Sequence, residues 1–330
     1  MRRVLAFVSA AVVGFAVPVM AQGQQDFSKV EIVTTKISNN FIALEGQGGR
    51  IGVLHGSDGI FMVDSQFAPL GDKIVAAIRK VSDQKIKYLV NTHVHGDHTG
   101  GNENIGKMGA TIIARPMLKE RLIKPNPPAG GGAAPPSAPA AALPAYTPDS
   151  LTRMTLDGET IDLIPLPQAH TDGDTAVKFE KNDVLMTGDV YRSVGFPNID
   201  RNSGGSLKGM LAAFDTLIAA AGPNTKVLPG HGPITNRAGI VAHKRMAIAL
   251  RDQVAKMMAE GKTQEQIVAA KITNAYEKQT GNAAGTGDRF INQLYAELKA
   301  SSLGGAPTDA GSPASAPCDS GAAAAPLATP

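Results

Sequence analysis

The 330-residue sequence has no tryptophan and one cysteine, Cys318, and only 5% of its residues are aromatic. A single cysteine cannot form a disulfide within the chain or a zinc finger built on cysteine ligands. Cys318 lies in an Ala/Pro-rich stretch with nothing to hold a base beside it, which favours an inert thiol over a catalytic one. Charge is scarce too, at 18% of residues with a formal net charge of +3. Because the basic residues are also scattered, a nucleic-acid partner is not expected.

Long apolar runs are missing except near the N-terminus. There, Arg2 and Arg3 precede a mostly apolar run over residues 4–19, and small residues at 19–21 offer a cleavage site. The run is interrupted by serine, glycine and proline, and is short for a membrane span, which needs roughly twenty residues. We expect residues 1–21 to be a signal peptide. The mature protein is then periplasmic or secreted, without stable membrane insertion.

Two stretches are too poor in large apolar side chains to build a core. Residues 125–148 contain 8 Pro, 8 Ala and 3 Gly, and residues 303–330 contain 5 Pro, 9 Ala and 4 Gly. Such segments bury too little apolar surface to offset their chain entropy. We expect a flexible insertion at 125–148, either a tolerated surface loop or a flap over a site, and a disordered tail at 303–330. The rest predicts one domain over residues 28–300.

The hydrophobic pattern of this domain changes along the chain from strand-like to helical. Short β-branched runs predict strands at 30–37, 40–45, 51–55, 60–64, 86–91, 111–114, 151–156, 160–166, 175–180, 184–187 and 226–228. Helical spacing and end signals predict helices at 70–81, 206–221, 236–259, 263–270 and 287–300. This order favours a layered α/β sandwich.

Histidine is also rare, with 7 residues, yet His93, His95 and His98 lie together around Asp97, directly after a predicted strand. In an extended segment, residues two positions apart point the same way, so His93 and His95 can reach one cation together. Gly96 lets the chain turn, so Asp97 and His98 can face a second, adjacent position. Imidazole and carboxylate are good ligands for zinc, and also for iron or manganese. The spacing therefore predicts a metal site.

Other polar residues follow predicted strands in similar contexts. His170 and Asp189 each come just after a strand, and His231 lies between two glycines beyond another strand. Taken singly, each could be a turn residue, but together with the first motif they favour a shared functional site. His55 and His243 match no motif, and we interpret them as ordinary turn and surface residues.

The ordered motifs Thr-His-Val-His-Gly-Asp-His at 92–98, His170, Gly-Asp at 188–189 and Gly-His-Gly at 230–232 resemble the metallo-β-lactamase superfamily. The resemblance covers about residues 28–300 and implies a single-domain, four-layer αββα sandwich. It also implies a site for two zinc ions, or iron or manganese. The ligands it implies are His93, His95 and His170 for the first metal, Asp97, His98 and His231 for the second, Asp189 as the bridge, and Asp64 as an orienting residue behind them.

The implied activity is hydrolysis of a small acyl substrate (ester, thioester, lactone or lactam) by a hydroxide generated between two zinc ions roughly 3.5–4 Å apart. Asp97 would orient this hydroxide or pass its proton to the leaving group. An aspartate bridge, with no cysteine at a metal position, favours the Asp-bridged hydrolases over the Cys-ligated lactamases. The alternatives are hydrolysis of a phosphodiester or sulfate ester, or a non-catalytic metal-binding role. The loop after Asp189 offers as candidate substrate contacts Tyr191, Arg192, Phe196 and Asn198.

Overall fold

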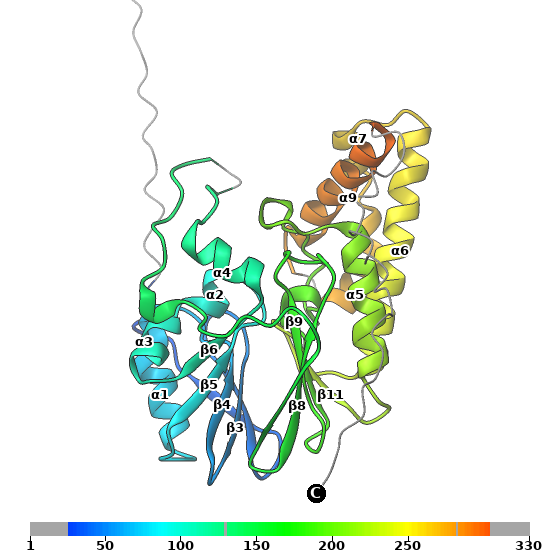
Figure 1. Ribbon diagram of the computed structural model, residues 1–330. Coiled ribbons are helices and arrows are strands. Elements are labelled where there is room, and N and C mark those ends of the chain that lie inside the picture. Colours follow the sequence, from blue (N-terminus) through cyan, green and yellow to red (C-terminus); the bar gives the residue numbers. More distant parts are fainter. Residues whose placement is uncertain (1–25, 129–130, 282, 304–330) are drawn as a thin grey trace, which may run out of the picture.

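A computed structural model describes residues 26–128, 131–281 and 283–303 of the chain. Two mixed β-sheets pack face to face in it, and helices cover the outer face of each sheet (Figure 1). The expected signal peptide and nearly all of the expected tail lie outside the described residues. Among the helices within those ranges, none combines the length and the apolar character needed to cross a bilayer.

The first sheet contains six strands in chain order, antiparallel from the first to the fourth and parallel from the fourth to the sixth. Parallel neighbours need a crossover, which helices provide on the outer face. The strands are β1 (Val33–Lys36), β2 (Phe41–Glu45), β3 (Ile51–Gly56), β4 (Gly59–Val63), β5 (Ile86–Val90) and β6 (Thr111–Ile113). The crossover helices are α1 (Gly71–Arg79), α2 (Gly96–Thr99) and α3 (Asn102–Lys107).

The second sheet contains five strands in the order β11-β10-β9-β8-β7, and only β10 and β11 are parallel. Helix α4 (Pro116–Ile123) precedes the sheet in the chain, and α5 (Leu207–Ala220) provides the crossover between the parallel pair. The strands are β7 (Thr152–Leu156), β8 (Glu159–Pro165), β9 (Thr175–Phe179), β10 (Val184–Met186) and β11 (Lys226–Leu228).

The C-terminal helices pack beside the second sheet and rise past one end of it (Figure 1). They are α6 (Arg237–Ala259), α7 (Gln264–Ala269), α8 (Glu277–Thr280) and α9 (Thr286–Leu303). The long helix α6 contacts both α5 and α9, so the C-terminal helices and α5 form one helical layer. Part of this layer extends beyond the end of the second sheet (Figure 1).

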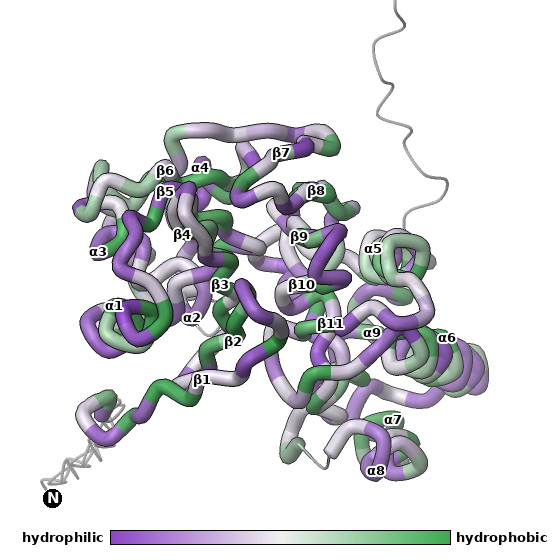
Figure 2. Tube along the Cα trace, turned by 90° about the horizontal axis from the view of Figure 1, so that it is seen from below, coloured by the Kyte–Doolittle hydropathy of each residue, from purple (hydrophilic) through white to green (hydrophobic). Residues whose placement is uncertain are grey.

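Three apolar clusters separate the four layers. Ile74 of α1 packs on the outer face of the first sheet, and Phe214 of α5 packs on the outer face of the second. Between the sheets, the rings of Phe41 and Phe61 both meet Phe179 edge-on. The hydropathy-coloured tube is accordingly green in parts of the sheets, for example around β2 and β3, and purple at many of the connecting loops (Figure 2). The predicted αββα sandwich is confirmed.

All predicted strands and helices are present, with ends shifted by a few residues. The segment 125–148, expected to be flexible, contains a short 3₁₀ helix, Ala140–Ala142, against α3. The N–H of Ala138 donates to the carbonyl of Leu122, and that of Ala145 donates to the carbonyl of Ile112. Part of this segment is therefore tied to the body of the domain, and the mobility of the whole segment stays a prediction.

One histidine is placed differently from the prediction. His243 was expected on the surface, but its side chain is buried in α6 with 4% exposure. Its ring meets the rings of Tyr191 and Phe214 nearly at right angles, with centroid distances of 5.2 and 5.7 Å. The reason is its spacing: Ile240, His243 and Ala247 all fall on the apolar side of the helix.

Candidate metal centre

The loops that follow β5, β8, β10 and β11 meet at one edge of the sandwich. The loop after β5 and the first turn of α2 carry the 93–98 motif, the loop between β8 and β9 carries His170, and a 3₁₀ turn after β10 carries Asp189. The turn after β11 carries His231. Residues far apart in the sequence thereby form overlapping groups of three, and within each group the ligand atoms lie within 4.8 Å of one another.

The first group contains His93, His95 and His170. Nδ1 of His170 donates to the carbonyl oxygen of Asn198 at 2.7 Å, which leaves the lone pair on Nε2. Nε2 of His95 lies 2.8 Å from a carboxylate oxygen of Asp200, which can only accept, so the lone pair of His95 is on Nδ1. These two lone pairs face each other across 3.0 Å. Two acceptors at this distance repel each other unless a cation lies between them.

The second group contains Asp97, His98 and His231. Nε2 of His231 lies 3.1 Å from Oδ2 of Asp97, and Nε2 of His98 lies 3.6 Å from the same oxygen. His98 is completely buried, whereas Asp97 and His231 keep 24% and 20% of their side chains exposed. This group therefore forms the solvent-facing side of the cluster.

Asp189 joins the two groups. Its Oδ1 lies 3.3 Å from Nε2 of both His98 and His231, and its Oδ2 lies 3.8 Å from Nε2 of His170. Gly230 permits this geometry, because a Cβ at that position would lie 2.1 Å from Oδ1 of Asp189. The carboxylate thus offers one oxygen to each group.

Asp64 holds the cluster from behind. Its backbone has a φ of 61°, which is rare for a residue with a side chain, and its carboxylate accepts from the N–H and the hydroxyl of Thr92 at 2.8 and 2.7 Å. It also accepts from Nδ1 of His98 at 2.7 Å. The Thr92 hydroxyl, which donates to Asp64, accepts from Nδ1 of His93 at 3.1 Å. One carboxylate therefore directs Nε2 of both histidines into the cluster.

The histidines of the cluster differ in the direction in which their pKa values are shifted. Burial, and then the proximity of other histidines, lowers the pKa of His93 well below its usual range and that of His170 to about 3. Burial also disfavours the charged form of His98, but Asp64 and Asp189 outweigh it and raise the pKa of His98 well above its usual range. Burial would raise the pKa of Asp189, yet the neighbouring imidazoles of His231 and His98 hold it well below the usual range.

The donor set fits bound cations. Among the residues that the structure describes, Nε2 of His93, Nε2 of His98 and Oδ1 of Asp189 are buried and have no hydrogen-bond partner. Buried polar atoms without partners are costly, and all three of these point into the same space. Nitrogen and carboxylate oxygen are the donors that zinc prefers when no thiolate is present. Divalent cations would satisfy these atoms and relieve the repulsion between the facing lone pairs.

The four candidate substrate contacts divide into two pairs. Asn198 lies at the cluster through its carbonyl bond to His170, and Nη1 of Arg192 lies 3.4 Å from Oδ2 of Asp189. Tyr191 does not face the cleft: its side chain is 3% exposed and packs in the helical core. This corrects the prediction, and the reason is that the backbone at Tyr191 is extended, so the neighbouring side chains of Tyr191 and Arg192 point to opposite sides.

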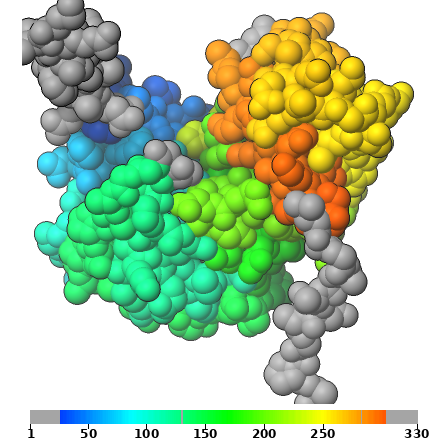
Figure 3. Space-filling view, turned by 90° about the horizontal axis from the view of Figure 1, so that it is seen from above, coloured from blue at the N-terminus to red at the C-terminus, as the bar shows by residue number. Residues whose placement is uncertain are grey.

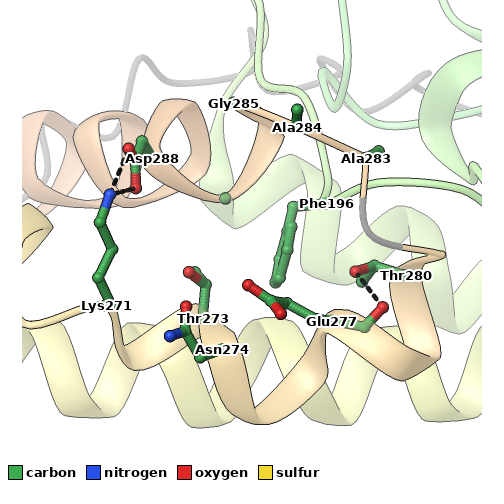
Figure 4. A pocket seen from close by; sticks show the side chains of 11 residues that line it. Phe196, Lys271, Thr273, Asn274, Glu277, Thr280, Ala283, Ala284, Gly285 and Asp288 are labelled. Carbon is green, nitrogen blue, oxygen red and sulfur yellow. Dashed lines mark hydrogen bonds and ion pairs between the residues drawn. The ribbon is translucent and has the colours of Figure 1, made fainter.

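Phe196 is also placed away from the metal cluster. Its ring stacks on Phe290 with a centroid distance of 6.4 Å and is 3% exposed. It forms one wall of a separate cavity of about 490 Å³ next to α8 and the start of α9, opposite the ion pair of Lys271 and Asp288 (Figure 4). Phe196 therefore supports the helical layer instead of lining the metal site.

Two site residues were missed by sequence reasoning. Asp200, which holds His95, lies eleven residues beyond Asp189 in an irregular loop, and only its place in that loop hinted at a role. Gly49 lies against His98 so closely that a Cβ would be 2.1 Å from Cε1 of the ring. Its N–H donates to the carbonyl of Asp97 at 3.0 Å, so the turn between β2 and β3 is tied to the metal cluster.

Comparisons with known proteins agree with this geometry. A family model described as the metallo-beta-lactamase superfamily matches residues 46–232. A hydroxyacylglutathione hydrolase from Nitrosococcus oceani is 29% identical over 217 residues, which is 64% of this chain and 72% of that protein.

Solved structures share the fold. A metallo-beta-lactamase from Pontibacter korlensis aligns with a TM-score of 0.53 and 19% identity, over 64% of this chain and 96% of that one. A stereoselective inverting sec-alkylsulfatase from Pseudomonas sp. aligns with a TM-score of 0.62 and 14% identity, over 84% of this chain and 52% of that one. The chain thus spans about half the length of the sulfatase.

Proposed function

Because the chain belongs to the metallo-beta-lactamase superfamily and is a hydrolase of that family, we propose that it cleaves a small acyl substrate with two bound zinc ions. The substrate is an ester, thioester, lactone or lactam. The observation that carries this proposal is the convergence of imidazole lone pairs on two neighbouring positions, with one oxygen of Asp189 directed at each. The name of the hydroxyacylglutathione hydrolase relative supports an acyl substrate.

In this proposal, His93, His95 and His170 hold one cation and Asp97, His98 and His231 hold the other. Bound zinc ions supply acidification of a water molecule and polarisation of the substrate carbonyl. The chain's own residues fix the geometry: Asp64 orients His98 and Thr92, and Asp200 orients His95. Preorganised ligands of this kind need no rearrangement during the reaction.

Proton transfer is assigned to Asp97. With 24% of its side chain exposed, against 5% for Asp189, it is the carboxylate of the cluster that can meet a substrate. A carboxylate beside the attacking water can take its proton and hand it to the leaving group.

The test is hydrolysis of a panel of esters, thioesters, lactones and lactams by the zinc-loaded protein and by the protein after chelation. We expect turnover that chelation abolishes and zinc restores. His231→Gln should lose activity and zinc, while His55→Gln, a histidine replacement outside the cluster, should retain both. Turnover of sulfate esters or phosphodiesters alone would replace the acyl assignment. Two bound zinc ions without any turnover would favour the non-catalytic role.

We also propose that the protein works in the periplasm or outside the cell after removal of residues 1–21. The N-terminal sequence alone supports this. N-terminal sequencing of the protein from the periplasmic fraction should begin near residue 22, and recovery of the intact chain from the cytoplasm would contradict export.

A further inference from the structure

A second cavity adjoins the metal cluster on the side of His95. Its volume is about 600 Å³, within the range typical of small-molecule sites. One wall comes from the loop around residues 198–202, and the other comes from α9, which contributes Arg289, Asn292 and Gln293. Seen from above, the surface of the C-terminal helices stands beside the green surface of the loop near residue 200 (Figure 3). A substrate with its reacting bond at the cluster can therefore extend towards α9.

One positively charged side chain that lines the cavity, Arg289, has no counter-ion among the described residues. Among the residues that the structure describes, no carboxylate lies within ion-pair distance of Arg289. Within the described part of the chain, its Nε is buried without a hydrogen-bond partner, and its Nη2 makes only a 3.4 Å contact with the carbonyl of Phe196. Arg201, on the same cavity, differs because its Nε pairs with Glu297 at 2.9 Å.

Arg192 adds a second positive charge nearby. Its Nε is also buried without a partner, and its only ion pair within the described ranges is the 3.4 Å contact with Asp189. Burial, and then the charge of Arg192, lowers the pKa of Arg289, and Asp189 offsets this only in part. Because the proposed function commits Asp189 to two cations, that carboxylate cannot also neutralise two arginines.

A partly buried guanidinium whose Nε has no acceptor is unfavourable unless a ligand supplies one. Its planar fork matches the two oxygens of a carboxylate. Resting on the proposed function, we infer that Arg289, with Arg192 beside it, binds a carboxylate group carried by the acyl substrate. The enzyme then selects anionic esters or thioesters over neutral ones, and Arg289 is the residue that determines this specificity.

Two matched esters test this inference: mono-4-nitrophenyl glutarate, which carries a carboxylate, and 4-nitrophenyl pentanoate, which is neutral. The zinc-loaded wild type should have a kcat/KM about 10- to 100-fold higher for the charged ester, the range of a hydrogen bond to a charged group. Arg289→Gln should reduce this ratio towards one, mainly through KM, and Arg289→Lys should recover part of it. Lys299→Gln removes an exposed charge from the same helix and should keep the wild-type ratio.

A wild-type ratio near one, or an unchanged ratio in Arg289→Gln, would overturn the inference. Calorimetric binding of glutarate separates this from failure of the hydrolase proposal. If neither ester is cleaved, glutarate binding to the wild type that is lost in Arg289→Gln still supports the carboxylate site. Equal binding to both proteins, or none to the wild type, refutes it.

Discussion

The stability of the protein should fall between pH 7 and pH 5 because of one buried histidine, His243 of α6. Its ring packs edge-on against Tyr191 and Phe214, and its Nε2 has no hydrogen-bond partner in the described ranges. Burial, and then the charge of Arg192, lowers the pKa of His243 to about 3. At pH 5 the ring is therefore neutral in the folded protein, whereas in the unfolded chain it takes up a proton near pH 6.5.

The sign and size follow from this difference. Because the folded pKa is the lower one, the contribution to stability is complete above about pH 6.5 and is lost as the pH falls towards 3. Each pH unit in this window changes the free energy of unfolding by about 1.4 kcal/mol. Between pH 7 and pH 5 the loss due to His243 alone is about 2 kcal/mol.

Urea unfolding at the two pH values measures this loss, in wild type and in His243→Phe and His243→Leu. Phenylalanine keeps an aromatic ring against Tyr191 and Phe214, and leucine guards against overpacking by the larger ring. Protonation of the metal ligands affects all three proteins equally, so the comparison isolates His243. The wild type should lose about 2 kcal/mol more than either variant. Equal losses in all three proteins would refute the burial argument.

Three further predictions concern the metal centre. Asp64→Asn should weaken zinc binding roughly 10- to 100-fold in a chelator competition, because the orienting acceptor for His98 is lost. Gly49→Ala should lower zinc content measured by atomic absorption, since the added Cβ would lie 2.1 Å from the His98 ring, whereas Gly96→Ala meets nothing within 4 Å and should retain its zinc. Asp97→Asn should reduce kcat about 100-fold in steady-state assays if Asp97 transfers the proton.

Each of these predictions has an outcome that contradicts it. Unchanged zinc affinity in Asp64→Asn would mean that the loop alone orients His98. Equal zinc contents in Gly49→Ala and Gly96→Ala would show that the close approach to His98 is not required. Full activity of Asp97→Asn with a full complement of zinc would remove its proposed role in proton transfer.

The strands and most of the site could be predicted from the sequence, because each depends on local pattern. Alternating and β-branched runs fix the strands, and the density of histidines at 93–98 is visible without any structure. The burial of His243 could also be predicted, because this residue continues the apolar spacing set by Ile240, Ala247 and Leu250. Position on a helix face, and not polarity, decided its burial.

Other features depend on contacts between distant segments, which a single sequence does not reveal. Asp200 reaches His95 across 105 positions of the chain, and Gly49 meets His98 through the turn between β2 and β3. The role inferred for Arg289 depends on the absence, among the described residues, of a carboxylate within ion-pair distance of it. Small side chains in segment 125–148 predicted no core, but backbone N–H groups, such as that of Ala145, supply hydrogen bonds regardless of side-chain size.

The central claim is that Asp189 joins two cation sites, and zinc stoichiometry tests it most directly. Purified wild type, Asp189→Ala and His243→Phe would each be dialysed against buffered zinc and analysed for metal per chain. We expect two zinc ions per chain in the wild type and in His243→Phe, and at most one in Asp189→Ala. A wild type that holds fewer than two, or an Asp189→Ala variant that holds two with unchanged affinity, would contradict this claim.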